Sequence, residues 1–413
     1  MMPFSWGEHL CSDILPWWEQ HAVDDEYGGV RTGFHNQGHL VTTDRFTWSQ
    51  GRWAWLSGEL AGEARSGRLS VDADIWKERC LRTCERLIRE AVRPDSRTHY
   101  RVSESGVPVA DASGETATSV FADLFCVLGL SAGLRHLRAD DPRANTWATI
   151  ALDMLTVAHS AIEKRTALSE PYPVPSGFLD LAGPMTLLHT SAELLRSYET
   201  DQACVRRIRD WSAEQLIQHH LMSQYWYEFY PTSPGMNETM LARHVTPGHL
   251  LELLWMIEHA EWQDPGFSML PPGSRASLAL RAVQLGWDEK YGGLLRYADR
   301  DGGQPRGRSV TQSAYESLVH QTWSTKLWWV HAEAVYGLTL LGQRDPELAE
   351  WATRIADWTM KVFPEPDAEW IQIRDQSGAP LNQVVALPVK DPLHIARAAL
   401  FMNRLLNDHE GGN

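Results

Sequence analysis

The 413-residue chain is poor in cysteine: it has five, an odd number without the spacing of a disulfide framework. Cys80 and Cys84 lie one helical turn apart, but no second cysteine or histidine pair follows to complete a zinc site. We therefore expect free, buried thiols in a reducing compartment. We expect no metal ion.

Positive charge is also in short supply. Lys and Arg number 38 against 53 Asp and Glu, which gives a formal net charge of −15. Nucleic acids and anionic membrane surfaces both require local positive charge in a protein that binds them. We therefore expect neither as a partner, and expect a neutral small molecule instead.

Long apolar runs are missing as well. No uncharged stretch approaches the roughly 18 residues that suggest a membrane span, and the first 20 residues lack the cationic and apolar segments of a secretory signal. No low-complexity linker divides the chain. These absences predict a cytoplasmic protein with a single domain over residues 1–413; a homodimer is left open.

Tryptophan, by contrast, is abundant, with 19 residues. Most should lie in the core, because large aromatic side chains dominate packing. Indole faces also stack on the C–H faces of sugar rings, so the excess mildly favours a carbohydrate ligand.

Helical periodicity covers most of the chain, and few segments alternate as strands do. The expected helices span residues 45–62, 74–92, 115–138, 144–164, 181–198, 203–222, 247–261, 274–285, 321–342, 346–362 and 392–407.

Short glycine-containing segments recur between these helices. "DDEYGGVRTGFHNQGHL" resembles "WDEKYGGLLRYADRDGGQ" at 287–304, and each precedes a Thr-Trp-Ser that opens a Trp-rich helix. Each reads as a small hairpin, and 369–380 is a third candidate. A recurring helix–hairpin–helix unit predicts an all-α ring of helices with hairpins at one rim.

Two histidines occupy matching places in "HVTPGHLLELLWM" and "VKDPLHIARAALFM". Thr246 and Asp391 are the expected N-caps, a proline follows each, and His249 and His394 fall at the third helical position. The partial positive charge of a helix start should keep imidazole neutral near pH 7. A neutral histidine can act as a general base, although each could also merely support the cap.

The helix around "TWSQGRWAWLSGEL" has two apolar faces, so both should be buried. Trp48 and Arg52 share one face, which directs Arg52 into a polar interior. Such an arginine needs an acidic partner or a ligand oxygen. A core Arg–Glu pair is the structural alternative.

Together, "EYGG", "WSQGRWAWL", "PMTLL", "TPGHLLELLW", "GWDEKYGGLLRYADRDG", "TKLWWVHAEA" and "KDPLHIAR" resemble the N-acylglucosamine 2-epimerase family. This family includes cellobiose 2-epimerases and mannose and sulfoquinovose isomerases. The resemblance implies an (α/α)6 barrel with an axial active site, and it runs along the whole chain.

The resemblance also implies roles for individual residues. His249 and His394 match the acid/base histidines, and Arg52 matches the arginine near the substrate carbonyl. Glu252 falls on the acidic partner of the first histidine. Lys390 is a further candidate for stabilising an oxyanion, and Trp48 and Trp329 are assigned to substrate binding. Some branches carry a third histidine, where this chain has Thr186, with His189 close by; neither receives a role.

The expected function is therefore a sugar 2-epimerase acting on an aldose or N-acylhexosamine, of the N-acylglucosamine/N-acylmannosamine type. One histidine removes the C2 proton and the other reprotonates an enediolate, without a metal or other cofactor. Aldose–ketose isomerisation is the alternative. A less favoured rival is an inverting glycoside hydrolase, which needs carboxylates about 6.5–9.5 Å apart; its candidates are Asp288, Asp299 and Glu333. A non-catalytic sugar-binding protein is a second rival.

Overall fold

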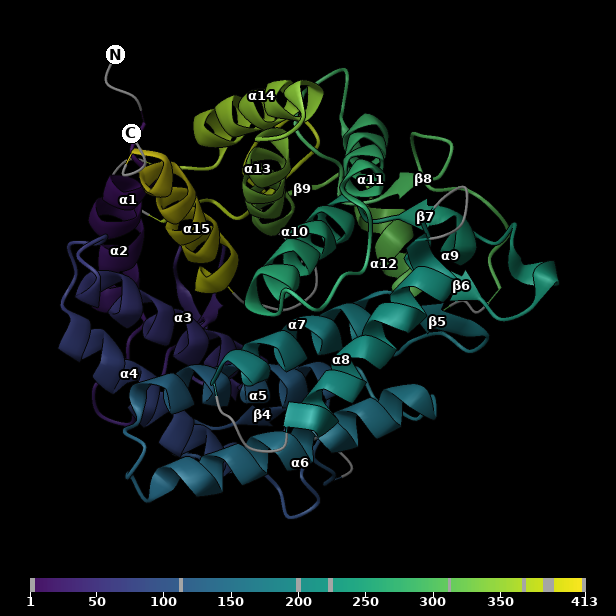
Figure 1. The fold of residues 1–413 in the computed structure, drawn as a ribbon. Coiled ribbons are helices and arrows are strands. Elements are labelled where there is room, and N and C mark those ends of the chain that lie inside the picture. Colours follow the sequence, from purple (N-terminus) through teal and green to yellow (C-terminus); the bar gives the residue numbers. More distant parts are fainter. Residues whose placement is uncertain are drawn as a thin grey trace. The chain divides into compact units, whose positions relative to one another are not determined.

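The computed structural model describes residues 4–110, 114–197, 202–221, 226–310, 313–365, 369–381 and 390–410. Over these residues the chain is mainly helical, and its strands are only two or three residues long (Figure 1). The prediction of a mainly helical protein is confirmed. None of the described helices combines the length and apolar character that crossing a bilayer requires.

The chain forms two compact units. The first comprises Met1–Pro171, Thr186–Ser212 and Pro388–Asn403. The second comprises Tyr172–Met185, Ala213–Leu387 and Arg404–Asn413. Each unit is described separately, and the expectation of one domain over 1–413 stays a prediction.

Unit 1 contains the first half of the helices and the start of the last one. Its elements are α1 (Trp6–His9), η1 (Leu10–Ile14), α2 (Leu15–His21), α3 (Thr47–Arg65), α4 (Ala73–Arg86), η2 (Leu87–Ala91), α5 (Val120–His136), α6 (Arg143–Glu163), β1 (Gly33–Phe34), β2 (Leu40–Thr42), β3 (Arg45–Phe46) and β4 (Arg101–Val102). It also holds most of α7 (Ala182–Ser197) and α8 (Gln202–Gln215), and α15 (Pro392–Glu410) as far as Asn403.

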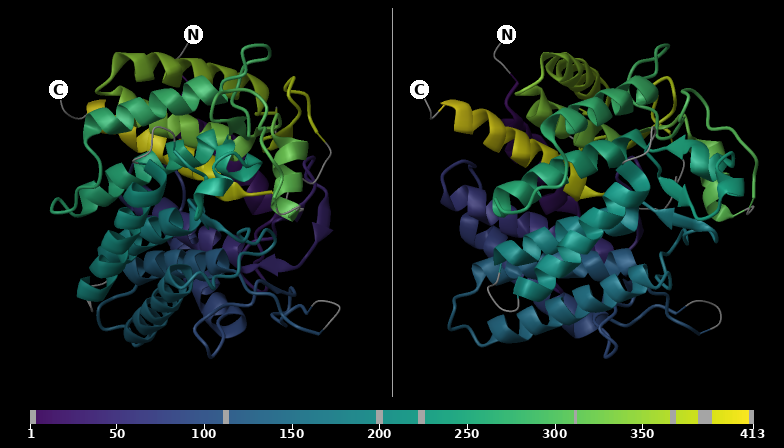
Figure 2. Two further views of the ribbon diagram at one scale, coloured as in Figure 1. Left: turned by 90° about the vertical axis from the view of Figure 1, so that its right-hand side faces the viewer. Right: turned by 45° about the vertical axis from the view of Figure 1, so that its right-hand side comes forward.

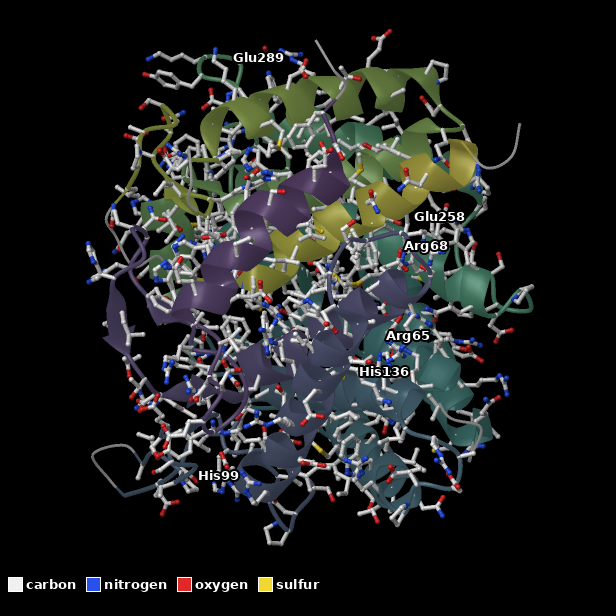
Figure 3. The ribbon with its side chains drawn as sticks, turned by 90° about the vertical axis from the view of Figure 1, so that its left-hand side faces the viewer. Arg65, Arg68, His99, His136, Glu258 and Glu289 are labelled. Carbon is white, nitrogen blue, oxygen red and sulfur yellow. The ribbon has the colours of Figure 1, made fainter. Side chains whose placement is uncertain are left out.

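Helix α3 is the centre of unit 1, packed against α4 and α5, and α5 in turn packs against α6. Two glycines allow α3 and α5 to touch: a Cβ on Gly51 would lie 2.0 Å from the Phe125 carbonyl oxygen, and one on Gly129 would lie 2.8 Å from the Gly51 oxygen. The far ends of these helices meet where Arg65 contacts His136, 3.1 Å between Nη1 and Nδ1 (Figure 3).

The last helix joins the first ones within unit 1. Phe401 of α15 lies edge-on to Trp55 of α3, with ring centroids 6.0 Å apart. A Cβ on Gly7 in α1 would come within 2.5 Å of the Asn403 side chain. Helix α1 and the part of α15 up to Asn403 therefore belong to the same unit; Figure 2 gives two further views of the ribbon.

Unit 2 holds the remaining elements. They are β5 (Phe178–Asp180), η3 (Leu216–Leu221), β6 (Phe229–Pro231), η4 (Pro234–Met236), α9 (Met240–Arg243), β7 (His244–Val245), α10 (Pro247–Gln263), α11 (Pro272–Gly286), β8 (Ala298–Asp299), α12 (Ala314–Thr322), β9 (Lys326–Leu327), α13 (Trp328–Gly342), α14 (Pro346–Val362) and β10 (Ile373–Arg374). Helix α13 packs against α10 and α14, and α10 also packs against α11.

The two Tyr-Gly-Gly segments are built alike. In each, one aspartate oxygen accepts hydrogen bonds from the backbone amides two and three residues later. The other oxygen pairs with a fully buried cation two residues ahead of a long helix: Asp24 with Arg45 before α3, and Asp288 with Lys326 before α13. Both glycine pairs have positive φ, between 72° and 83°. The two similar sequence segments therefore form a structural repeat.

Some boundaries differ from expectation. Residues 321–327 end α12 and form β9, because Lys326 and Leu327 pair with Arg374 and Ile373 of β10. The first hairpin pairs with itself, as β1 with β2, whereas β8 pairs with β7. Only Cys80, Cys84 and Cys126 of the free cysteines are buried; Cys11 and Cys204 are partly exposed.

Candidate active site

His249 lies in the first turn of α10, in unit 2. Thr246 is the N-cap of α10 by position, but its side chain makes no capping hydrogen bond, and Pro247 is the first helical residue. Gly248 lets the helix start approach Trp329, since a Cβ there would lie 2.7 Å from the indole. The His249 ring lies tilted against the same indole, with centroids 4.9 Å apart and an angle of 33° between the planes.

The partner of His249 is Glu228, which the sequence did not reveal. Its Oε1 lies 2.8 Å from His249 Nδ1, and the carboxylate is buried while the histidine side chain is 25% exposed. The Nε2 atom has no hydrogen-bond partner among the described residues, so it is the nitrogen able to exchange a proton. Glu228 directly precedes β6, outside α10. The sequence signal that could have indicated it is a carboxylate inside the aromatic stretch "YWYEFY".

The contact with Glu228 acts against the effect expected of the helix start. Burial opposes protonation of His249, but the Glu228 carboxylate and its hydrogen bond favour it, and the pKa of His249 is raised. A helix start favours the neutral ring and a carboxylate in contact favours the protonated one, so the neutral state of His249 near pH 7 stays a prediction. Glu252 also raises the pKa of His249 by its charge, so it lies close by as predicted.

Asp180 is a further acidic residue close enough to interact electrostatically with Glu228 and His249. Burial raises the pKa of Asp180 to about 6, with the Glu228 charge adding to the effect and His249 opposing it. Asp180 Oδ2 accepts a hydrogen bond from the backbone amide of Gly183 in the first turn of α7, at 2.8 Å.

His394 lies in the first turn of α15, in unit 1. Asp391 caps the helix as predicted, with Oδ1 accepting from the Leu393 amide at 2.8 Å. The other oxygen, Oδ2, lies 3.5 Å from His394 Nε2. The Nδ1 atom of His394 faces Arg397 Nη2 at 3.3 Å, one turn along the helix. Because a guanidinium can only donate, this nitrogen is the acceptor.

Arg52 reaches the same carboxylate. Its Nη1 lies 2.6 Å from Asp391 Oδ2, and its guanidinium lies over Trp48 at 4.7 Å and over Phe125 at 4.1 Å. Arg52 thus pairs with an acidic residue, the aspartate that precedes α15. Asp391 thus contacts Arg52 and His394 together, a role that its position as a cap concealed.

Lys390 and the third-histidine positions lie elsewhere in unit 1. Lys390 is buried, its Nζ 5.5 Å from the Trp17 ring, and its amide donates to the Thr32 carbonyl at 2.9 Å. Thr186 and His189 are buried in α7, and His189 lies 6.4 Å from the Trp55 ring.

The candidate residues divide between the two units. His249, Glu228 and Trp329 belong to unit 2, with Glu252 acting on His249. Arg52, Trp48, Asp391, His394 and Arg397 belong to unit 1. The expectation that the two histidines face each other across one pocket stays a prediction.

The carboxylates proposed for a glycoside hydrolase have structural partners. Asp288 holds its turn and pairs with Lys326 at 3.0 Å, and Asp299 pairs with Arg243 at 2.7 Å. Glu333 accepts the Trp255 indole hydrogen at 2.7 Å. Pairing with buried cations leaves Asp288 and Asp299 unsuited to proton transfer.

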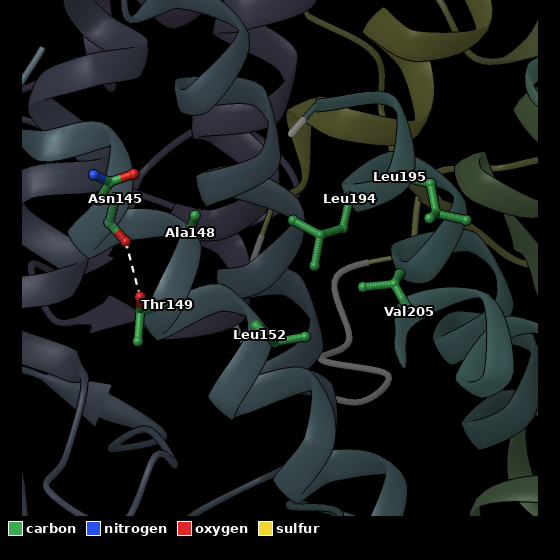
Figure 4. Close-up of a pocket in the computed structure, with 7 residues that line it drawn as sticks. All are labelled: Asn145, Ala148, Thr149, Leu152, Leu194, Leu195 and Val205. Carbon is green, nitrogen blue, oxygen red and sulfur yellow. Dashed lines mark hydrogen bonds between the residues drawn. The ribbon is translucent and has the colours of Figure 1, made fainter. Parts of the chain in front are cut away.

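A hollow in unit 1 is lined by none of the candidate residues. It has a volume of about 160 Å³ and is lined by residues of α6, α7 and α8: Asn145, Ala148, Thr149, Leu152, Leu194, Leu195 and Val205 (Figure 4). Small-molecule pockets usually measure about 300–1,000 Å³ and contain convergent polar groups. The hollow is mostly apolar and lacks a titratable side chain, so it is not a catalytic site.

Known proteins resemble this chain along its length. The profile of the family described as N-acylglucosamine 2-epimerase (GlcNAc 2-epimerase) matches residues 107–398. The chain belongs to the N-acylglucosamine 2-epimerase family. It is therefore an enzyme of the carbohydrate epimerase class, as predicted from the sequence.

Individual relatives are distant but nearly full-length. The N-acylglucosamine 2-epimerase of Bos taurus is 24% identical, with 98% of this chain and 92% of that protein aligned. The Homo sapiens enzyme is also 24% identical, over 97% and 90% of the two chains.

Solved structures share the fold. A cellobiose 2-epimerase from Bacillus thermoamylovorans superposes with a TM-score of 0.73 at 16% identity, over 97% of this chain and 98% of the other. A D-mannose isomerase gives 0.72 at 16% identity, over 96% and 97%. The predicted all-α fold of the (α/α)6-barrel class is confirmed; the position of the hairpins at one rim stays a prediction.

Proposed function

We propose that this chain is a sugar 2-epimerase acting on an aldose or N-acylhexosamine, of the N-acylglucosamine/N-acylmannosamine type. The observation that carries the proposal is the buried Glu228 carboxylate on Nδ1 of His249, which leaves Nε2 to exchange a proton with substrate. A carboxylate that orients a histidine and raises its basicity is a general device of acid–base catalysis.

The second histidine supplies the other half of the reaction. Removing the proton at C2 of an open-chain sugar yields a planar enediolate, and inversion requires a proton from the opposite face. His394 is held by Asp391, whose Oδ2 lies 3.5 Å from Nε2 and also pairs with Arg52, and by Arg397 at 3.3 Å from Nδ1. In each direction of this scheme one histidine is the neutral base and the other the protonated acid, with the roles exchanged in reverse.

The remaining candidates hold the substrate. Arg52 stabilises the oxyanion at C1, since a fixed guanidinium in a dry site costs no reorganisation. Lys390 is a second candidate for this role. Trp48 and Trp329 offer indole faces to the sugar ring, and Glu252 tunes His249. No metal or other cofactor takes part in this scheme.

Aldose–ketose isomerisation is the second candidate. It is favoured by the structural likeness to a D-mannose isomerase. An isomerase returns the proton to C1, so a single base on one face suffices. Epimerisation is preferred here because both histidines lie in polar clusters that support proton transfer.

A screen in D2O tests the proposal. Aldoses and N-acylhexosamines are incubated with the enzyme and followed by NMR. We expect the C2 epimer to accumulate with deuterium at C2. A ketose as the main product would replace epimerisation by isomerisation, and release of a reducing sugar from an oligosaccharide would favour the hydrolase. The cytoplasmic location, the lack of a nucleic-acid partner and a homodimer remain predictions.

A further inference from the structure

Arg296 is a buried cation without an ion-pair partner among the described residues. It is 7% exposed, and its Nε has no hydrogen-bond partner in the described part of the chain. Its Nη1 donates to the Thr322 hydroxyl at 3.1 Å, and its guanidinium lies 4.9 Å from the Tyr297 ring. No carboxylate of the described residues forms an ion pair with it.

The other buried cations of unit 2 are all paired. Among its described residues these are Arg243 with Asp299, Arg275 with Glu258, Lys326 with Asp288, and Arg374 with Glu365. Burying a charge without a partner costs several kcal/mol. Burying Arg296 therefore costs free energy that the other buried cations of the unit regain through ion pairs. Such a cost is tolerated where a ligand offsets it.

The repeat shows that the hairpin itself does not need a cation here. Aligning Asp24 with Asp288 and the two glycine pairs places Thr32 opposite Arg296. Thr32 is fully buried in a hairpin with the same turn and the same aspartate–cation pair. The turn shared by the two repeats therefore does not require an arginine at position 296.

Arg296 lies beside the catalytic cluster of unit 2. Its positive charge lowers the pKa of His249 against the larger effect of Glu228, so the guanidinium is within electrostatic reach of the ring. Tyr297 is buried and Tyr315 partly buried close to it, and their rings lie 6.4 Å apart. The surroundings are aromatic and dry, which strengthens any charge contact made there.

We propose that Arg296 is a specificity-determining residue that binds an acidic substituent of the sugar, a carboxylate or phosphate group. This inference rests on the proposed function. A guanidinium with unused donors binds such a group through charge-assisted, frequently bidentate hydrogen bonds. The bound acid would supply the missing counter-charge, so the enzyme should prefer acidic sugars, against the expectation from net charge of a neutral substrate.

The test compares acidic and neutral sugars in matched pairs. Glucuronate and glucose 6-phosphate are compared with glucose, and mannuronate and mannose 6-phosphate with mannose, by NMR of deuterium incorporation at C2. For the wild type we expect kcat/KM to be higher for at least one acid than for its parent hexose, by about 10- to 100-fold. Arg296→Met and Arg296→Thr should abolish this preference, mainly through KM of the acid. Lys290→Met removes an exposed cation from the same hairpin and should keep the preference.

Thermal unfolding separates binding from a structural role. Removing an unpaired buried charge relieves a cost, so the Tm of Arg296→Met should be no lower than that of the wild type. Arg243→Met breaks a buried ion pair and should lower Tm by several degrees. A similar fall in Arg296→Met, or no preference for acids in the wild type, would overturn the proposal.

The two proposals can fail separately. If no sugar exchanges its C2 proton, the proposed function fails. Calorimetric binding of the same four acids to the wild type and Arg296→Met then decides the role of Arg296: a weakened acid affinity in the variant supports it, and equal affinities overturn it.

Discussion

The starts of α10 and α15 look alike in sequence and differ in the partners of their histidines. Both place a histidine at the third helical position behind a proline. Nδ1 of His249 contacts the buried Glu228 carboxylate at 2.8 Å. His394 contacts Asp391, which also pairs with Arg52, through Nε2, and the Arg397 guanidinium through Nδ1. The same local motif therefore places two histidines in different hydrogen-bond networks.

That difference suits a reaction in which two groups exchange protons with opposite faces of one substrate. The Glu228 carboxylate raises the pKa of His249. Asp391 and Arg397 instead hold the two ring nitrogens of His394. Two catalytic groups in unlike environments are a common arrangement for an acid and a base.

Removing either ring should have the largest effect. We expect His249→Asn and His394→Asn each to lower epimerisation by about 10²–10⁴-fold or more, because each loses a positioned acid or base. Deuterium incorporation at C2 sharpens the comparison. One variant should still exchange the C2 proton of the epimer that its remaining base can attack. Two fully active variants would end the two-histidine scheme.

Arg52→Met should come next. It leaves the buried Asp391 carboxylate without its guanidinium, and breaking such a pair costs about 3–5 kcal/mol. Tm and turnover should both fall. Adding Asp391→Asn removes the unpaired charge and keeps a capping residue, so Tm should recover while turnover stays low. Recovery of both would make Arg52 structural.

Glu228→Gln should have a moderate effect that depends on pH. The amide can still accept from Nδ1, but the charge that raises the pKa of His249 is gone. The alkaline limb of the kcat/KM profile should move to lower pH. An unchanged profile would mean that Glu228 does not set the proton affinity of His249.

Glu228→Gln should also change the thermal stability in a way that depends on pH. The pKa of His249 is raised on folding, so this contribution is complete below its unfolded value of about 6.5 and fades as pH rises through the folded value. The pKa of Glu228 is lowered on folding despite burial, so its contribution fades as pH falls through its folded value. The Tm difference between wild type and Glu228→Gln should therefore be largest between about pH 4.3 and 6.5.

Replacing the two prolines should have the smallest effect. Pro247 and Pro392 each begin a helix at the position where proline is favoured. Changing either to alanine should cost about 0.4–1 kcal/mol through the unfolded chain, measured by denaturant titration. Similar values would show that the two helix starts share their scaffold and differ only in neighbours.

The sequence by itself determined the helices, the repeated hairpins, the family and both catalytic histidine candidates. These depend on periodicity, caps and turn residues, which act over a few neighbouring positions. Arg52 was also placed correctly, because apolar residues on two faces of one helix leave a charged side chain no route to water.

Only the tertiary structure decided which charges meet. Glu228 reaches His249 from a segment 21 residues away, and Arg52 reaches Asp391 across 339 residues. Electrostatic interaction depends on distance and burial in space, and neither can be read from sequence separation. Neither the contact that raises the pKa of His249 nor the lack of an ion pair at Arg296 among the described residues could therefore be predicted from the sequence.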